Sequence, residues 1–281
     1  MPRRSVLSDG GGSTWGVAEY GDPAGHPLVL HHGLIGSAVL PHVWDQLAGP
    51  AGVRLIAVER PGYGVTPPRE MTRIAEWATL LEPLLDRLGV DAFDVLGISA
   101  GAPYAYALAA GFGERVRGVW VLSGLPYVCD DAVRGHYPQA AEPVWAFYRE
   151  GPPDEVAASF AAAAPRFAGA FATSPTMLAA LAEVDDHHQR GPAREVRLQS
   201  RPWGFTLADV RRPVRLWHAV EDEQVPFEAV RATAALLPDA RLTEQPEPTH
   251  VPAESSLRAL FGELAERRVA PPEEGGATQR H

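Results

Sequence analysis

Short apolar runs alternate along the chain with segments in which apolar residues recur at helical spacing. The runs are typical of buried strands and occupy residues 27–30, 53–58, 93–96, 119–122, 214–217 and 241–243. The spacing between them favours helices over residues 71–88, 100–110, 227–237 and 255–268. Strands separated by helices predict a parallel sheet with right-handed crossovers.

The alternation stops between residues 126 and 205, which are rich in alanine, proline and aromatic residues and show no strand pattern. This stretch predicts a helical cap (lid) inserted into an α/β core. We therefore expect the core in two parts, residues 1–125 and 206–270. Residues 271–281 are rich in glycine, proline and glutamate, which is typical of a disordered tail.

The composition excludes several classes of protein. Hydrophobic residues make up 46% of the 281 and charged residues 21%, as in globular domains that fold by burial. The net charge is −10 and no lysine is present, which argues against a nucleic-acid partner. With the single cysteine Cys129 and no apolar run near the ~20 residues of a membrane span, we expect a cytoplasmic protein without a membrane anchor.

Ser99 stands in the pattern Gly-x-Ser-x-Gly, residues 97–101, directly between a predicted strand and a predicted helix. In that context the serine is held on a sharp, strained turn, and the flanking glycines avoid clashes with the neighbouring strand and helix. Taken alone, the pattern would also fit a serine that caps a helix. Together with the motifs below, it predicts a nucleophile.

A histidine-glycine turn follows the first of these apolar runs, at residues 31–36. A tetrahedral oxyanion needs two preorganised donors, and the backbone amides of Leu34 and Ala100 are placed to supply them. Adjacent histidines on an extended segment point to opposite faces, so we expect no metal at His31 and His32.

A serine nucleophile needs a base and a group that orients the base. Asp222 follows the predicted strand 214–217, and His250 follows the last predicted strand, so both belong to loops at the carboxyl edge of the sheet, where ligands bind. Glu221 and Glu223 are alternative acids by proximity. The chain order of serine, aspartate and histidine is the order associated with this kind of sheet.

Five motifs in one order and spacing resemble the α/β-hydrolase superfamily, in particular its capped serine hydrolases of the esterase-like branch; they are residues 32–33, 60–64, 97–101, 222–226 and 249–250. The resemblance covers residues 13–268. It implies an α/β-hydrolase fold: a mostly parallel eight-stranded sheet flanked by helices, with a helical lid inserted after the sixth strand. It also implies a triad of Ser99, Asp222 and His250 that works without a cofactor or metal.

The sequence departs from the family pattern at three positions, where Ala219 and Thr249 replace a usual glycine and Glu59 a usual aspartate. None of these changes removes a reactive group. Ser99 argues against the epoxide hydrolases and haloalkane dehalogenases, which resemble this chain in fold but use an aspartate nucleophile. For residues 60–64 we expect bracing of the site by arginine hydrogen bonds and glycine turns, with a direct substrate role of Arg60 as the alternative.

The predicted cap supplies apolar side chains that favour a small to medium, largely apolar substrate. We assign substrate binding to Ile35, Trp145, Tyr148, Trp203 and Val251. Residues 185–188 (Asp-Asp-His-His) are either a solvated helix face or a site for a cationic amine, and the latter would indicate an aminopeptidase.

We therefore expect hydrolysis of an ester, thioester or lactone through an acyl-enzyme, with a small molecule as partner and a monomeric or homodimeric protein. The same triad on this fold also serves carbon–carbon bond hydrolases and lyases. A non-catalytic protein that binds a hydrophobic ligand is the alternative from another class.

Overall fold

The computed structural model describes residues 3–9 and 11–269, so the predicted tail lies outside the described residues. One eight-stranded sheet crosses the described part of the chain in the order β1-β2-β4-β3-β5-β6-β7-β8. Its strands are β1 (Arg3–Ser8), β2 (Thr14–Gly21), β3 (His26–His31), β4 (Val53–Val58), β5 (Phe93–Ile98), β6 (Val116–Leu122), β7 (Val214–Ala219) and β8 (Ala240–Gln245).

The sheet is mostly parallel, as predicted. β2 pairs antiparallel with both β1 and β4, whereas every neighbouring pair from β4 to β8 is parallel. The strands β3 to β8 therefore end at one edge of the sheet, and the loops that follow them meet there. This edge carries the candidate site.

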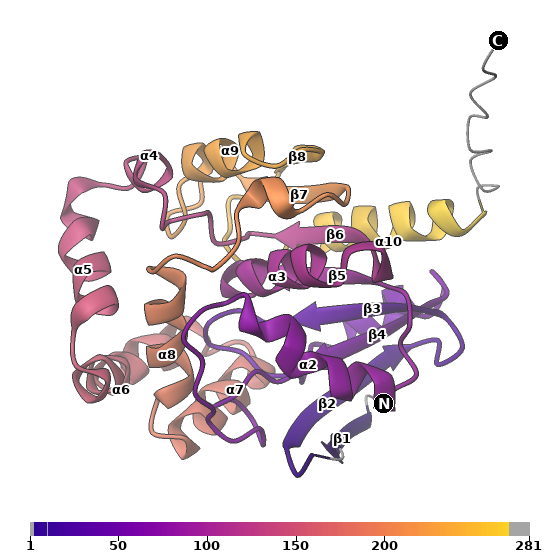
Figure 1. Ribbon diagram of the computed structural model, residues 1–281, viewed down its shortest axis with the longest axis horizontal. Coiled ribbons are helices and arrows are strands. Elements are labelled where there is room, and N and C mark those ends of the chain that lie inside the picture. The colour runs from indigo at the N-terminus through magenta and orange to yellow at the C-terminus, as the bar shows by residue number, and fades with distance from the viewer. Residues whose placement is uncertain (1–2, 10, 270–281) are drawn as a thin grey trace.

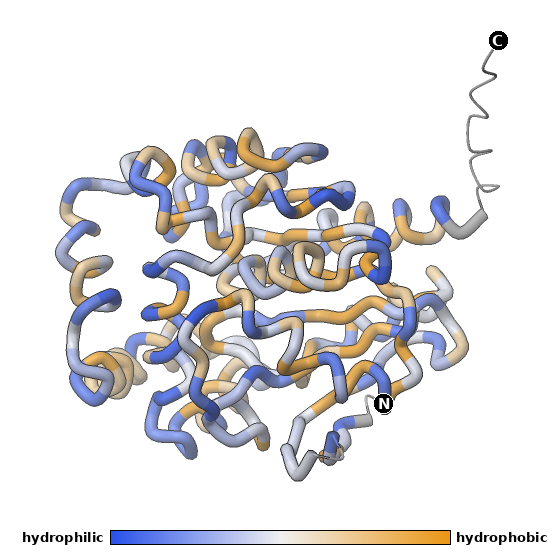
Figure 2. The backbone as a smooth tube through the Cα atoms, in the orientation of Figure 1, coloured by the Kyte–Doolittle hydropathy of each residue, from blue (hydrophilic) through white to orange (hydrophobic). Residues whose placement is uncertain are grey.

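Helices cover both faces of the sheet, which explains why its central strands are nearly continuous apolar runs. Figure 1 shows α2 (Glu76–Arg87) and α3 (Ala102–Phe112) in front and α10 (Glu254–Val269) behind. One apolar core lies under α2, α3 and α9 (Phe227–Ala235), and a second lies under α1 (Val43–Ala48) and α10. The hydropathy colouring in Figure 2 follows this arrangement, with hydrophobic residues concentrated along the central strands.

The chain between β6 and β7 contains helices and no strand. These helices are α4 (Asp131–Arg134), α5 (Glu142–Glu150), α6 (Pro153–Ala170), α7 (Pro175–Asp186) and α8 (Arg190–Gln199), and we call them the cap. In Figure 1 they stand at the left, beyond the ends of the strands, with α8 next to the sheet and α5 and α6 farther out.

Helix α8 crosses the loop after β4 with the two backbones in contact. Gly62 has a φ of +84°, and a Cβ on Gly191 would lie 2.4 Å from the Gly62 carbonyl oxygen. Arg194 then donates to the carbonyl oxygens of Pro61 at 2.6 Å and Arg69 at 3.0 Å. The start of α8 is thus fixed to the core, and its later turns reach toward the ends of β4 and β5.

Within the described residues, no helix is both long enough and apolar enough to cross a membrane.

Candidate active site

The backbone at Ser99 has the sharp turn that its sequence context predicts. The residue has a φ of +49°, a conformation that costs energy for any residue with a Cβ. A Cβ on Gly97 would lie 2.6 Å from the Cα of Ala102, and one on Gly101 would lie 2.1 Å from the His31 carbonyl oxygen. Both flanking glycines are therefore required for the turn to pack between β3 and α3.

Three side chains from three loops form a continuous hydrogen-bonded chain. The Oγ of Ser99 lies 2.8 Å from Nε2 of His250, and Nδ1 of His250 lies 2.7 Å from Oδ2 of Asp222. Because an ionised carboxylate only accepts hydrogen bonds, Nδ1 carries the proton and Nε2 accepts the Ser99 hydroxyl. The structure therefore brings together the three residues of the predicted triad with the base in the tautomer that acyl transfer requires.

Asp222 is held in the ionised form by the donors around it. Burial raises the pKa of this carboxyl, but the hydrogen bond from His250 and the amides of Val225 and Gln224 outweigh burial, so that the pKa lies below its ordinary value. The two amides donate to Oδ1 at 3.0 and 2.8 Å. Glu221 and Glu223, the alternative acids, have no such contact with His250.

A second imidazole, His218, lies behind Asp222. Its Nε2 is 2.9 Å from the Val225 carbonyl oxygen and 3.3 Å from Oδ2 of Asp222. Burial lowers the pKa of His218 against the opposing effects of Val225 and Asp222, so His218 is neutral at pH 7 with its proton on Nε2. The same carboxylate oxygen thus faces His250 on one side and His218 on the other.

The two predicted oxyanion donors belong to peptides next to Ser99. A Cβ on Gly33 would lie 3.6 Å from the Ser99 Cβ, so the peptide before Leu34 packs directly against the serine. The Leu34 N–H has no acceptor within residues 3–9 and 11–269. Ala100 lies in the first turn of a helical segment, where backbone N–H groups have no intrahelical acceptor.

Each of these two peptides is held by its carbonyl side. The Ser99 carbonyl oxygen, which shares a peptide with the Ala100 N–H, accepts the Leu125 amide at 2.9 Å. The Gly33 carbonyl oxygen, which shares a peptide with the Leu34 N–H, lies 2.7 Å from Nδ1 of His32. Holding the carbonyl fixes the direction of the N–H because the peptide group is planar.

Both histidines of the turn are buried and neutral. Burial lowers the pKa of His31 and of His32 well below 6.5, and the charge of Arg60 lowers it further. Nε2 of His32 accepts the Arg60 backbone N–H at 3.4 Å, so its Nδ1 is the donor to Gly33. Among the described residues, no three histidine, cysteine or acidic side chains are arranged to hold a metal ion.

Arg60 connects this turn with the cap. Its guanidinium is fully buried, pairs with Glu195 of α8, and lies 4.9 Å from the ring centroid of Tyr104 and 5.4 Å from that of Tyr63. Although burial lowers the pKa of Arg60, the charge and hydrogen bonds of Glu195 raise it beyond its ordinary value. Gln199, also on α8, donates to the Ala100 carbonyl oxygen at 2.9 Å.

The five side chains predicted to bind substrate lie in four different environments. Ile35 is buried in the turn after β3, whereas Val251 is 63% exposed beside His250. Trp145 and Tyr148 lie half-buried on α5, with ring centroids 6.2 Å apart. Trp203 is fully buried in the core, where it packs against Tyr127 and uses its Nε1 on the Gln199 carbonyl. We therefore leave Trp203 out of the pocket proposed below.

Trp145 lines a hollow of about 390 Å³ between α4 and α5, together with Tyr137, Arg134 and Glu142. The rings of Tyr137 and Trp145 meet edge to face at 5.4 Å. Burial and the charge of Asp222 raise the pKa of Tyr137. Trp145 of α5 and Tyr137 thus form one aromatic wall of this hollow.

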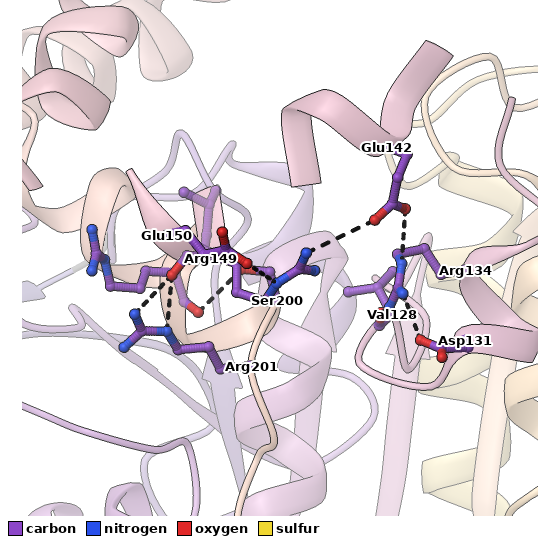
Figure 3. Close-up of polar contacts among 10 residues, drawn as sticks. Val128, Asp131, Arg134, Glu142, Arg149, Glu150, Ser200 and Arg201 are labelled. Carbon is purple, nitrogen blue, oxygen red and sulfur yellow. Dashed lines mark hydrogen bonds and ion pairs between the residues drawn. The ribbon is translucent and has the colours of Figure 1, made fainter. Parts of the chain in front are cut away.

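A polar network fixes both ends of α5, as Figure 3 shows. Arg201 donates to the Arg149 carbonyl oxygen through Nε at 3.0 Å and Nη2 at 2.7 Å. Glu142 accepts from Arg134 at 3.0 Å and lies 3.9 Å from Arg149. The helix that carries Trp145 and Tyr148 is thus attached to the segment directly after α8 on one side and to the chain that leaves β6 on the other.

Four of the groups described above were not predicted from the sequence, namely His218, Leu125, Glu195 and Gln199. Glu195 stands among arginines in a helix and shows no local pattern of a buried charge. For His218, its place at the end of the strand before the acid was a usable signal.

Comparisons with known proteins show the fold family of the chain. The family model described as "alpha/beta hydrolase fold" matches residues 26–252. A pimeloyl-[acyl-carrier protein] methyl ester esterase of Aromatoleum aromaticum is 32% identical over 241 residues, which cover 80% of this chain and 91% of that protein.

Among solved structures, the esterase RhEst1 of Rhodococcus sp. ECU1013 aligns with a TM-score of 0.63 and 22% identity, covering 94% of this chain and 99% of that one. The haloalkane dehalogenase DbeA of Bradyrhizobium elkani USDA94 aligns with a TM-score of 0.68 and 20% identity over 96% and 99%. At these identities the structures share the fold, and the reaction has to be argued from the site.

Proposed function

Because the chain belongs to the alpha/beta hydrolase fold family, we propose that it is a serine hydrolase that cleaves a carboxylic ester of a small to medium, largely apolar acid. The observation that carries this proposal is the unbroken chain from Ser99 through His250 to Asp222, with distances of 2.8 and 2.7 Å. The relative named a methyl ester esterase supports the choice of bond.

In the proposed reaction Ser99 Oγ attacks the ester carbonyl carbon while His250 takes the hydroxyl proton. The carbonyl oxygen becomes an oxyanion, which accepts hydrogen bonds from the amides of Leu34 and Ala100. His250 then gives the proton to the leaving alcohol, and an acyl-enzyme forms. Water, activated by His250, attacks the acyl carbon and releases the acid and Ser99. Asp222 stays ionised throughout and stabilises the imidazolium.

Ser99 separates this proposal from the chemistry of the dehalogenase with the same fold. Asp222 lies 2.7 Å from Nδ1 of His250. We therefore assign this carboxylate to orienting the base and not to attacking the substrate. Trp145 and Tyr148 on α5 and Ile35 beside the oxyanion turn supply the proposed apolar surface for the acyl group.

The proposal is tested with a fluorophosphonate probe and a panel of p-nitrophenyl esters of graded acyl length. We expect the probe to label Ser99 stoichiometrically, Ser99→Ala to abolish both labelling and turnover, and short to medium esters to be cleaved fastest. Asp222→Asn should lower kcat by about 10⁴-fold because the imidazole then adopts the wrong tautomer.

Three results would count against parts of this assignment. Absence of labelling would contradict the assignment of Ser99 as the nucleophile. Labelling without turnover of any ester would favour carbon–carbon bond cleavage or ligand binding. Full turnover by Asp222→Asn would move the acid to another residue.

A further inference from the structure

One fully buried ion pair connects the cap with the oxyanion turn. Nη2 of Arg60 lies 2.9 Å from Oε2 of Glu195, and Nε of Arg60 donates to the other carboxylate oxygen. Both side chains have no exposed surface. A two-point contact of this kind fixes the plane of the guanidinium as well as its position.

The same guanidinium holds the backbone of the turn. Nη1 of Arg60 donates to the His32 carbonyl oxygen at 2.6 Å, and Nη2 donates to the Gly33 carbonyl oxygen at 3.2 Å. The Gly33 carbonyl and the Leu34 N–H belong to one planar peptide. A donor on the carbonyl oxygen therefore both orients the Leu34 N–H and polarises it, which makes it a stronger donor.

We propose that Glu195 of the cap is a positioning residue for the oxyanion hole and acts through Arg60 on the peptide between Gly33 and Leu34. The proposal rests on the function proposed above, in which the Leu34 amide binds the oxyanion. Glu195 touches no reacting atom. Its carboxylate keeps the guanidinium in the plane from which Nη1 and Nη2 reach the two carbonyl oxygens.

Another ion-pair contact connects the cap with the core but does not reach the oxyanion turn. Arg4 of β1 contacts both Glu59, at the end of β4, and Glu183 of α7. This contact ties α7 to the core, yet neither Arg4 nor Glu183 is hydrogen-bonded to the oxyanion turn. Glu183, whose ion pair is partly exposed, is therefore the control for attachment of the cap.

The experiment compares Glu195→Gln with Glu183→Gln. For Glu195→Gln we expect kcat to fall on the order of tenfold with little change in KM, which is less than the 10²–10³-fold loss on removal of an oxyanion donor because the amide remains but is misoriented. The affinity for phenylboronic acid, whose adduct on Ser99 places an oxygen in the oxyanion hole, should fall by the same factor. Glu183→Gln should change neither value.

A double variant separates positioning from stability. Breaking one half of a buried pair leaves an unpaired charge, whereas removing both halves is often tolerated. Arg60→Gln with Glu195→Gln should therefore recover the Tm that Glu195→Gln loses, while kcat and the boronic acid affinity stay low. Recovery of both together with the Tm would overturn the proposal, since the pair would then serve stability alone.

The amide resonance of Leu34 tests the same inference without any reaction. In ¹⁵N–¹H spectra of the full-length protein, we expect this resonance to shift in Glu195→Gln and to stay in place in Glu183→Gln. An unshifted Leu34 amide in Glu195→Gln would refute the positioning role. This readout holds even if no ester is cleaved, so failure of the proposed function and failure of this inference are distinguishable.

Discussion

Ser99, the proposed nucleophile, has a strained backbone. Its φ of +49° is unfavourable for serine and alanine but acceptable for glycine. We predict that Ser99→Gly is more stable than Ser99→Ala, with a free energy of unfolding that is higher by about 1 kcal/mol. Neither variant should react with a fluorophosphonate.

Urea denaturation of the two variants measures this difference, with the wild-type protein as reference. Equal stabilities would mean that the backbone at position 99 is relaxed in solution. In that case the serine would have to be directed toward His250 by other contacts.

His218 gives a second prediction at this scale, because its neutral Nε2–H faces the Asp222 oxygen that also binds His250. That N–H is hydrogen-bonded to the Val225 carbonyl oxygen, and its dipole lies 3.3 Å from the Asp222 carboxylate. Losing this dipole should cost about 1 kcal/mol, so His218→Leu should lower kcat about fivefold with KM little changed. His218→Gln, which keeps an N–H donor near the position of Nε2, should retain most of kcat. If both variants lose activity equally, the imidazole acts by packing alone.

At the scale of elements, the crossing of α8 over the loop after β4 depends on two glycines in backbone contact. Gly191→Ala would place a methyl group 2.4 Å from the Gly62 carbonyl oxygen. We predict a loss of about 1–3 kcal/mol in the free energy of unfolding, as for other overpacked sites, and a lower kcat because α8 carries Glu195 and Gln199.

The control for this prediction is Gly169→Ala in α6, where an added Cβ meets nothing within 4 Å. Alanine has the higher helix propensity, so this variant should gain about 0.5–1 kcal/mol. The Tm values of the two variants show whether the crossing of α8 over the loop after β4 can accommodate an added methyl group. An unchanged Tm in Gly191→Ala would show that α8 shifts without cost.

The elements that the sequence predicted are those with a strong apolar signal. The runs at 53–58 and 93–96 correspond to β4 and β5, and the Gly-x-Ser-x-Gly pattern lies between β5 and α3 as expected. Strands β1 and β2 had no such signal. They form an antiparallel edge whose pairing, Leu7 with Trp15 for example, follows from tertiary contacts more than from a local apolar run.

The site shows the same division. Ser99 and His250 are 151 residues apart, yet each follows a predicted strand, so local pattern and sheet topology together bring them to one edge. Arg60 and Glu195 are 135 residues apart, and Glu195 lies in a helix with the arginines 194 and 197 beside it. In such a helix a glutamate indicates a solvent-facing position, and only the docking of α8 makes it buried.

For the whole molecule, buried neutral histidines predict how stability depends on pH. The folded-state pKa values of His31, His32 and His218 lie below 6.5, so below pH 6.5 the unfolded chain binds more protons than the folded chain. The stability that these neutral histidines contribute is therefore fully present above pH 6.5, and it is lost as the pH falls below 6.5. At pH 5.5, one unit below the ordinary histidine pKa, each of these histidines lowers the free energy of unfolding by up to about 1.4 kcal/mol.

Urea denaturation at pH 7.5, 6.5 and 5.5 checks this dependence. His218→Gln removes one of the three groups, and because burial lowers the pKa of His218 less than that of His31 and His32, it should reduce the slope by at most about a third if the three sites act independently. A stability that does not change between pH 7.5 and 5.5 would mean that these histidines are protonated in the folded protein.

The buried pair of Arg60 and Glu195 also limits how this architecture can be recombined. Caps are attractive units for engineering, since exchanging one between homologues promises a new acyl preference on an unchanged catalytic base. Here removal of the native cap would take away the counter-ion of a guanidinium that stays in the core and has no exposed surface. A chimaera should therefore transplant the acid of α8 and the arginine after β4 as one unit.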